Sequence, residues 1–173
     1  LDGWKEVIEW CLDQKISVGI VGAAVDIQNS LYNANNIEDE LICHFNDIKD
    51  ASGNKLLLDL RGKTSLIELA GACEQADAVI SVDSGPLHIA AAVNTNVLAV
   101  VGNGVTGKGA SPIRLWMPRS DNVSRTISKE DCNECEKRRY KNSSCVLADH
   151  ACMNGIESQT VIDWISKTLS YDD

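Results

Sequence analysis

The sequence lacks a hydrophobic run long enough to cross a membrane: its longest apolar stretches, such as VLAVV at 97–101, fall far short of the roughly 20 residues required. The N-terminal stretch LDGWKEVIEW carries acids and tryptophans where a secretory signal would carry a basic region and an apolar core. Basic residues are also scarce, with 16 Lys and Arg against 25 Asp and Glu, a net charge of -9. We therefore expect a cytoplasmic protein with no transmembrane segment and no nucleic-acid partner, in which local basic positions do any phosphate binding.

Short apolar strands alternate with helical segments along most of the chain. Runs such as ISVGIVG at 16–22 are rich in β-branched residues and end at glycine. Such runs are typical of buried parallel strands. Strands are expected at 16–22, 55–60, 76–82, 96–102 and 115–117. Helices are expected at 4–14, at 26–50 either whole or broken near 33–36, at 66–76, from 85 and at 161–169. This order predicts one α/β domain over residues 1–173, with a Rossmann-like, doubly wound parallel sheet that binds ligands beyond the carboxyl ends of its strands. Residues 119–157 show no clear period and are predicted to be an irregular, cysteine-rich segment.

The stretch SVDSGPLH at 81–88 follows the third predicted strand. Pro86 suits a first helical turn, so a helix is expected to begin beside Ser84. The free amides and dipole of that helix start would attract an anion, and Gly85 would let a phosphate approach the backbone. Ser84 and His88 could each donate a hydrogen bond, while Asp83 would orient the loop. The alternative is an ordinary turn between strand and helix, with His88 as a core residue.

Two further loops, 22–26 and 61–65, follow the first and second strands and are expected at the same edge of the sheet. Lys63, Thr64 and Ser65 supply a cation and hydroxyls there, which favours a phosphate site over a plain turn. The GKTS sequence resembles the tail of a P-loop, but position 57 is leucine where that motif needs glycine. A nucleoside triphosphatase is therefore not expected.

Residues 60–102, LRGKTSLIELAGACEQADAVISVDSGPLHIAAAVNTNVLAVVG, resemble the C-terminal, sugar-nucleotide-binding domain of glycosyltransferase family 9. The family's GKTSL-x-ELA and D-[ST]-G-P-x-H-x-A-A-A patterns stand in them almost unchanged. This family contains the heptosyltransferases that build the lipopolysaccharide core. The resemblance implies a GT-B architecture, in which two Rossmann-like domains face each other and the C-terminal one holds ADP-heptose.

The resemblance also implies a role for each matched residue. Ser84, Gly85 and His88 would contact the diphosphate, with Asp83 supporting them. Lys63 and Thr64 would lie near the adenosine. Asp26 stands where family members often place a glutamate on the ribose hydroxyls, although a solvated acid at a helix start is an equal alternative.

The chain departs from the family pattern at two places. After the fourth strand it reads GNGVTGKGASP in place of a G-P-T turn, so Thr106 and Lys108 are only candidate phosphate contacts. The N-terminal acceptor-binding domain, which carries the carboxylate base in the family, is not in this sequence. No catalytic residue is therefore expected in this chain, which alone should not transfer a sugar.

The resemblance implies an inverting displacement in which the helix start at Gly85 stabilises the departing ADP. No Mg²⁺ is required if helix amides and His88 bear that charge, and the sequence contains no Asp-x-Asp pair. The implied acceptor is lipopolysaccharide or a related glycoconjugate or protein, met at the inner face of the inner membrane.

The seven cysteines fall into two groups. Cys11, Cys43 and Cys73 stand singly in helical segments and are expected to be buried apolar residues. The other four, Cys132, Cys135, Cys145 and Cys152, have the spacing C-x2-C-x9-C-x6-C, which predicts a tetrahedral metal site. Thiolate ligands suit zinc and iron equally, and free thiols or disulfides are the alternative.

A second function from another class is a metal-stabilised nucleotide-binding or assembly module without transferase activity. The altered loop after Gly102 and the absent N-terminal domain are the features that favour it.

Overall fold

The computed structural model describes residues 2–24, 37–102, 113–126, 128, 132, 134 and 151–170. The chain divides into two compact units, Leu1–Leu69 and Ala70–Asp173. Each unit pairs parallel strands with helices, which confirms the predicted α/β class. In the described part of the chain no helix is long and apolar enough to cross a membrane.

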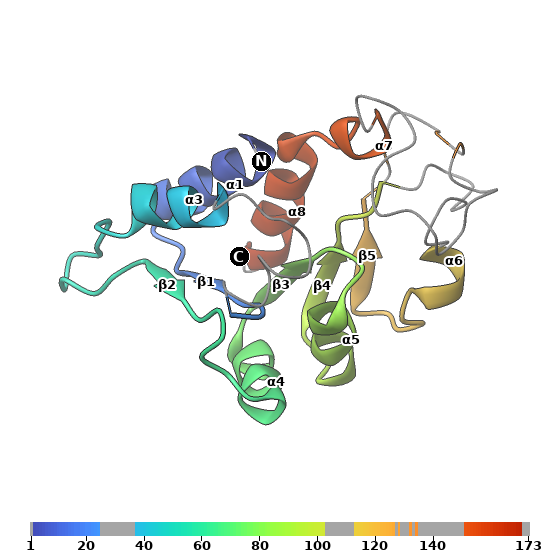
Figure 1. The fold of residues 1–173 in the computed structure, drawn as a ribbon, viewed down its shortest axis with the longest axis horizontal. Helices are drawn as coiled ribbons and strands as arrows, with labels where there is room; N and C mark the ends of the chain where they lie inside the picture. The colour runs from blue at the N-terminus through green and yellow to red at the C-terminus, as the bar shows by residue number, and fades with distance from the viewer. Residues whose placement is uncertain are drawn as a thin grey trace. The chain divides into compact units, whose positions relative to one another are not determined.

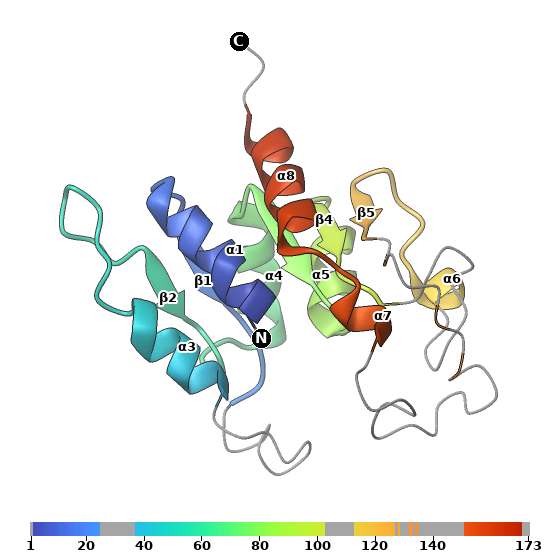
Figure 2. The same ribbon diagram turned by 90° about the horizontal axis from the view of Figure 1, so that it is seen from above.

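The first unit packs two helices against a two-stranded parallel sheet. It contains α1 (Asp2–Asp13), β1 (Val18–Ile20), α3 (Ile37–Phe45) and β2 (Leu57–Asp59), with Val18 in register with Leu57 (Figures 1 and 2). Apolar residues three and four apart on α1 and α3 face the sheet, as the helical period predicts. The core that they form with β2 consists of Ile8, Leu12, Ile42, Phe45, Leu56 and Leu57.

The second unit is built on a three-stranded parallel sheet in the order β3-β4-β5. Its elements are β3 (Ala78–Ser81), α5 (Gly85–Ala92), β4 (Asn96–Ala99), α6 (Ile113–Trp116), β5 (Val123–Arg125), α7 (Ala151–Asn154) and α8 (Ser158–Leu169). Helices α5 and α8 lie on opposite sides of the sheet, so β4 is buried on both faces (Figure 1). Burial on both faces explains the continuous apolar run of this strand.

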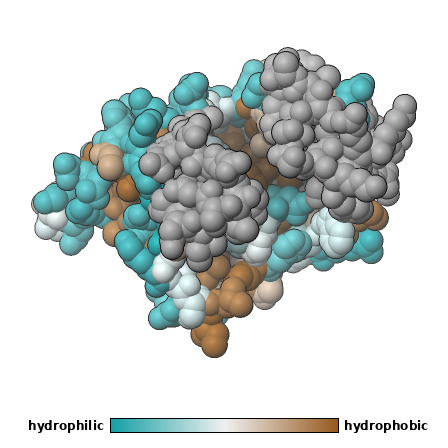
Figure 3. Space-filling model, viewed as in Figure 1, coloured by the Kyte–Doolittle hydropathy of each residue, from teal (hydrophilic) through white to brown (hydrophobic). Residues whose placement is uncertain are grey.

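Helix α4 (Leu66–Gln75) carries the GKTSL-x-ELA pattern and runs across the boundary between the two units. Its inward residues Leu69 and Cys73 are buried, whereas Leu66 and Ile67 are 75% and 85% exposed. A hydrophobic patch accordingly lies over the start of this helix (Figure 3). The first turn of α4 therefore presents apolar side chains to solvent.

The single predicted sheet is found as two sheets among the described strands. The hydrogen-bonded ladder joins β1 only with β2, and a separate ladder joins β3, β4 and β5. Strands of three or four residues carry few ladder bonds, so the apolar pattern predicts each strand without fixing which strands pair.

The prediction of a strand at 115–117 is wrong, because the chain there forms the end of helix α6 and a bend. The strand lies instead at β5, inside the stretch 119–157 that was predicted to be irregular. Polar side chains hold β5 in place: Asn122 Nδ2 donates to the Thr95 carbonyl at 2.5 Å, and the buried Thr126 hydroxyl accepts from the Val101 N–H at 3.0 Å. A strand of sequence VSR held by such contacts has no hydrophobic period to reveal it.

The three single cysteines differ in burial. Cys11 and Cys73 are buried as predicted, and burial raises the pKa of the Cys11 thiol to about 11. The prediction is wrong for Cys43, which is exposed on α3. Among the described side chains of α3, Ile42 and Phe45 are buried and take the inward positions on either side of Cys43.

Candidate functional site

The loop after β3 turns directly into α5, as the sequence predicts. Ser84 is the residue before the helix, with an extended backbone at φ -154° and ψ 172°, and Pro86 lies in the first turn. The Leu87 N–H donates to the Ser84 carbonyl at 3.1 Å, which closes that turn. The fixed φ of proline and its missing N–H suit this position, so the local sequence determines where the helix begins.

Gly85 leaves the start of α5 open to solvent. The residue is exposed, and a Cβ atom built on it would meet nothing within 4 Å. The positive end of the helix dipole and the Gly85 N–H are therefore accessible to a ligand. This is the geometry that lets a phosphate approach the backbone closely.

The Ser84 side chain makes no capping hydrogen bond to the helix. Its hydroxyl lies 3.1 Å from the hydroxyl of Ser81, a buried residue at the end of β3, whose own hydroxyl donates to the Val82 carbonyl at 2.9 Å. Because the Ser81 hydroxyl already donates its hydrogen bond to Val82, the Ser84 hydroxyl can donate either to Ser81 or to a ligand. Ser81 was not among the predicted site residues, since a serine inside a strand carries no recognisable signal.

His88 lies beside Asp83 at the same helix start. Its Nε2 is 4.0 Å from Asp83 Oδ1, close enough for an ion pair when the ring is protonated. The His88 side chain is 47% exposed, so the alternative of a core histidine is wrong. Asp83, Ser84, Gly85 and His88 therefore stand together at one end of α5, within the second unit.

The loop after β2 is closely tied to the loop after β1, as their shared edge predicts. The Gly62 N–H donates to the Gly22 carbonyl at 2.9 Å, and the backbone of Ala24 lies against Gly62. Lys63 reaches back along the same turn, where its Nζ donates to the Asp59 carbonyl at 2.6 Å. Thr64 is half-buried beside it.

Arg61 anchors this loop and was not predicted. Its guanidinium donates to Asp59 Oδ1 through Nε at 3.0 Å and to Asp39 Oδ1 of α3 through Nη2 at 2.7 Å, and its side chain is only 4% exposed. The hydrogen bond from Arg61 lowers the pKa of Asp59. An arginine after a strand normally reads as a solvated residue, and Asp39 lies 22 positions away, so the sequence carries no signal for this network.

Ser65 forms hydrogen bonds at the start of α4. Its N–H and hydroxyl both donate to Glu68 Oε2 at 2.8 Å, and its hydroxyl accepts from the Glu68 N–H at 3.3 Å. This is a capping box at the start of α4, and the spacing S-x-x-E was the signal for it. The ligand contacts that the family resemblance implies in this loop, Lys63 and Thr64, stay predictions.

The remaining predicted residues are described only in part. Asp26, Thr106 and Lys108 lie outside the described residues, as do Cys135 and Cys145. Cys132 and Cys152 are half-buried, and the described residues contain no group of three or more His, Cys, Asp or Glu that could hold a metal ion. Cys152 lies in α7, whose Met153 side chain packs against Gly102 after β4.

Two curated proteins resemble part of the chain. Lipopolysaccharide heptosyltransferase 3 of Escherichia coli is 35% identical over 86 residues, which are 50% of this chain and 23% of that protein. The protein of the same name from Escherichia coli strain K12 is 35% identical over 85 residues, 49% of this chain and 22% of that protein. The aligned part thus spans less than a quarter of the length of either relative.

Solved structures share the fold of nearly the whole chain. A glycosyl transferase family 9 structure from Veillonella parvula DSM 2008 matches 97% of this chain and 40% of its own, with a TM-score of 0.65 at 14% identity. The Escherichia coli ADP-heptose lps heptosyltransferase II matches 96% of this chain and 40% of its own, with a TM-score of 0.60 at 18% identity. At sequence identities of 14% and 18%, these two structures show that the fold is shared.

The family itself follows from the sequence. Residues 1–145 match the family described as glycosyltransferase family 9 (heptosyltransferase), a match that includes both quoted motifs and the start of α5. This chain belongs to glycosyltransferase family 9.

Proposed function

We propose that this chain is the donor-binding part of an inverting GT-B glycosyltransferase, which binds ADP-heptose or a similar nucleotide sugar. The observation that carries the proposal is the open helix start at Gly85, which lies inside the D-S-G-P-x-H motif of a heptosyltransferase family. Residues 1–173 would form this part as one domain. Family membership favours a transferase over the non-catalytic nucleotide-binding module.

The helix start would hold the diphosphate of the donor. The Gly85 N–H and the dipole of α5 would point at the phosphates, and the side chains of Ser84 and His88 would add donors. As the bond between sugar and phosphate breaks, negative charge grows on the leaving diphosphate, where these fixed donors stabilise it. Lys63 and Thr64 would lie near the adenosine, and Asp26 near the ribose.

The acceptor hydroxyl would be activated from outside this chain. Its base is proposed to come from an N-terminal acceptor-binding domain, with lipopolysaccharide or a related glycoconjugate or protein as acceptor at the cytoplasmic face of the inner membrane. An oxygen nucleophile needs a base near its proton to attack the anomeric carbon. The acceptor name is taken from the curated relatives, which are called lipopolysaccharide heptosyltransferases.

Nucleotide titration tests the proposal. In calorimetric titrations of the chain with ADP, ADP-heptose and a UDP-sugar, we expect ADP to bind at least about tenfold more tightly than UDP, about 1.4 kcal/mol. The His88→Ala variant should bind ADP more weakly. It should keep its fold, because this side chain is half exposed. Tighter binding of UDP than of ADP would assign another donor class, and no binding of either would remove the nucleotide site.

We also propose that Cys132, Cys135, Cys145 and Cys152 bind one zinc or iron ion, a proposal that rests on their spacing. Elemental analysis of protein purified without chelator should find about one ion per chain, and Cys135→Ser should lose most of it. Cys43→Ser, which changes an exposed cysteine outside the group, is the matched control and should keep the ion. Full metal content in Cys135→Ser, or two disulfides in fresh protein, would contradict the site.

A further inference from the structure

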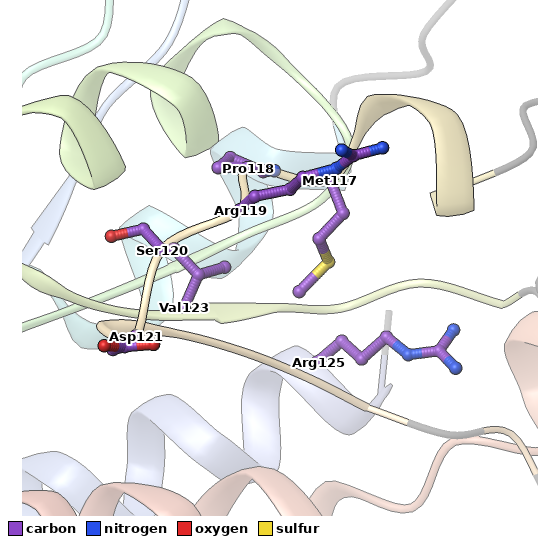
Figure 4. Close-up of a pocket in the computed structure, with 7 residues that line it drawn as sticks. All are labelled: Met117, Pro118, Arg119, Ser120, Asp121, Val123 and Arg125. Carbon is purple, nitrogen blue, oxygen red and sulfur yellow. The ribbon is translucent and has the colours of Figure 1, made fainter.

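A hollow of about 590 Å³ lies beside β5 in the second unit. Its walls include Met117, Pro118, Arg119, Asp121, Val123 and Arg125. The guanidinium groups of Arg119 and Arg125 extend toward the same end of the hollow, with the Met117 side chain between them, while Asp121 lies at the other end (Figure 4). We call this surface the arginine hollow.

Neither arginine forms an ion pair with an acidic side chain of the described residues. The chain has 25 Asp and Glu against 16 Lys and Arg, so acidic side chains outnumber the basic ones that they could pair with. Arg125 is also half-buried, and the desolvation of its cation costs free energy that no carboxylate of the described residues offsets. A bound anion would remove that cost, which points to a ligand.

The backbone that carries the two arginines is held rigidly. The Val123 N–H donates to the Ser120 carbonyl at 3.1 Å, and Asn122 Nδ2 donates to the Thr95 carbonyl at 2.5 Å. Arg125 lies in β5 in register with Ala99 of β4. These bonds set the backbone positions from which the two arginine side chains extend before a ligand arrives.

Most of the arginine hollow lies away from the helix start at Gly85, and only Arg125, at the carboxyl end of β5, shares the register row of Ala99 with Ser81. Asn122, beside the hollow, contacts the Ala91 and Thr95 carbonyls at the carboxyl end of α5, whereas Ser84 lies at its amino end. An eight-residue helix is about 12 Å long. Residues 117–121 also lead into β5, while the DSGPLH motif leaves β3, and these strands are both parallel to β4.

We propose that the arginine hollow binds a phosphate group at a second site, apart from the proposed nucleotide site. The planar guanidinium groups of Arg119 and Arg125 would each donate hydrogen bonds to phosphate oxygens. Met117 and Val123 offer an apolar wall to the molecule that carries the phosphate. A free phosphate in solution and a phosphate on a lipid headgroup present the same oxygens to the guanidinium groups, so both sources are tested below.

Calorimetric titration of the full chain with inorganic pyrophosphate tests the site, with ADP kept saturating so that a nucleotide site is filled. The double variant Arg119→Gln, Arg125→Gln should bind pyrophosphate at least about tenfold more weakly than the wild type. The matched control, Lys5→Gln with Lys167→Gln, removes the same two charges from exposed positions on α1 and α8 and should bind normally. Vesicles of phosphatidylglycerol, compared with phosphatidylcholine, test the lipid source with the same variants.

If the double variant loses pyrophosphate binding and the control variant keeps it, the result supports a free phosphate. If the same difference is found with phosphatidylglycerol vesicles, the result supports a lipid headgroup. If the double and control variants behave alike with both probes, the proposal is overturned. A fall in ADP affinity in the double variant would also overturn it, because the hollow would then belong to the nucleotide site. Failure of ADP to bind the wild type contradicts the proposed function only and leaves this test unchanged.

Discussion

Replacing Gly62 by alanine is expected to lower the free energy of unfolding by about 3 kcal/mol. Gly62 has φ +65°, in the left-handed region that a residue with a Cβ adopts only at a cost. A Cβ at this position would also stand 2.6 Å from the Ala24 Cβ and 2.8 Å from the Ala24 Cα. The Ala24 backbone cannot move away easily, because the Gly62 N–H is bonded to the Gly22 carbonyl of the same loop.

Urea unfolding of Gly62→Ala and Gly53→Ala separates the two causes. Gly53 has φ +84° but nothing within 4 Å of its Cβ position, so Gly53→Ala carries the backbone strain alone and should cost about 1 kcal/mol. Hydrogen exchange should place the extra loss of Gly62→Ala in the first unit, at β1 and β2. Equal losses in the two variants would show that the contact between the loops after β1 and β2 adds nothing to stability.

Local signals in the sequence were sufficient for much of the fold. The helical period predicts α1, α4 and α8, and the apolar runs predict β1 to β4 within a few residues. Pro86 places the start of α5, and with it the predicted site residues Asp83, Ser84, Gly85 and His88. These features depend on neighbours in the chain, which is why they can be predicted without an alignment.

Features that depend on distant residues could not be predicted. The pair Arg61–Asp39 joins residues 22 positions apart, and Ser81 becomes part of the site only because the turn brings Ser84 back to it. Strand β5 is held by Asn122 and Thr126, whose hydrogen bonds reach Ala91 of α5 and Ala99 of β4. The division of five strands into two ladders is likewise a property of pairing, which a pattern along one strand does not encode.

Replacing Gly85 by valine is expected to weaken the binding of ADP by a factor of about ten or more, which corresponds to about 1.4 kcal/mol. The Cβ and its two methyl groups would occupy the open space above the first turn of α5, where the proposed diphosphate must approach the backbone. The protein itself should tolerate the change, since nothing lies within 4 Å of the Cβ position. A residue with a Cβ before Pro86 disfavours the helical conformation, so we expect a loss of stability of about 1 kcal/mol.

Gly71→Val is the matched control for this prediction. Gly71 lies in α4, and its Cβ position also has nothing within 4 Å, so the same substitution adds the same side chain to another open helix position. Circular dichroism should show both variants folded, and calorimetric titration should show the loss of ADP only in Gly85→Val. Because the exposed amide at Gly85 carries the proposed function, unchanged ADP affinity in a folded Gly85→Val protein would remove the diphosphate from this helix start.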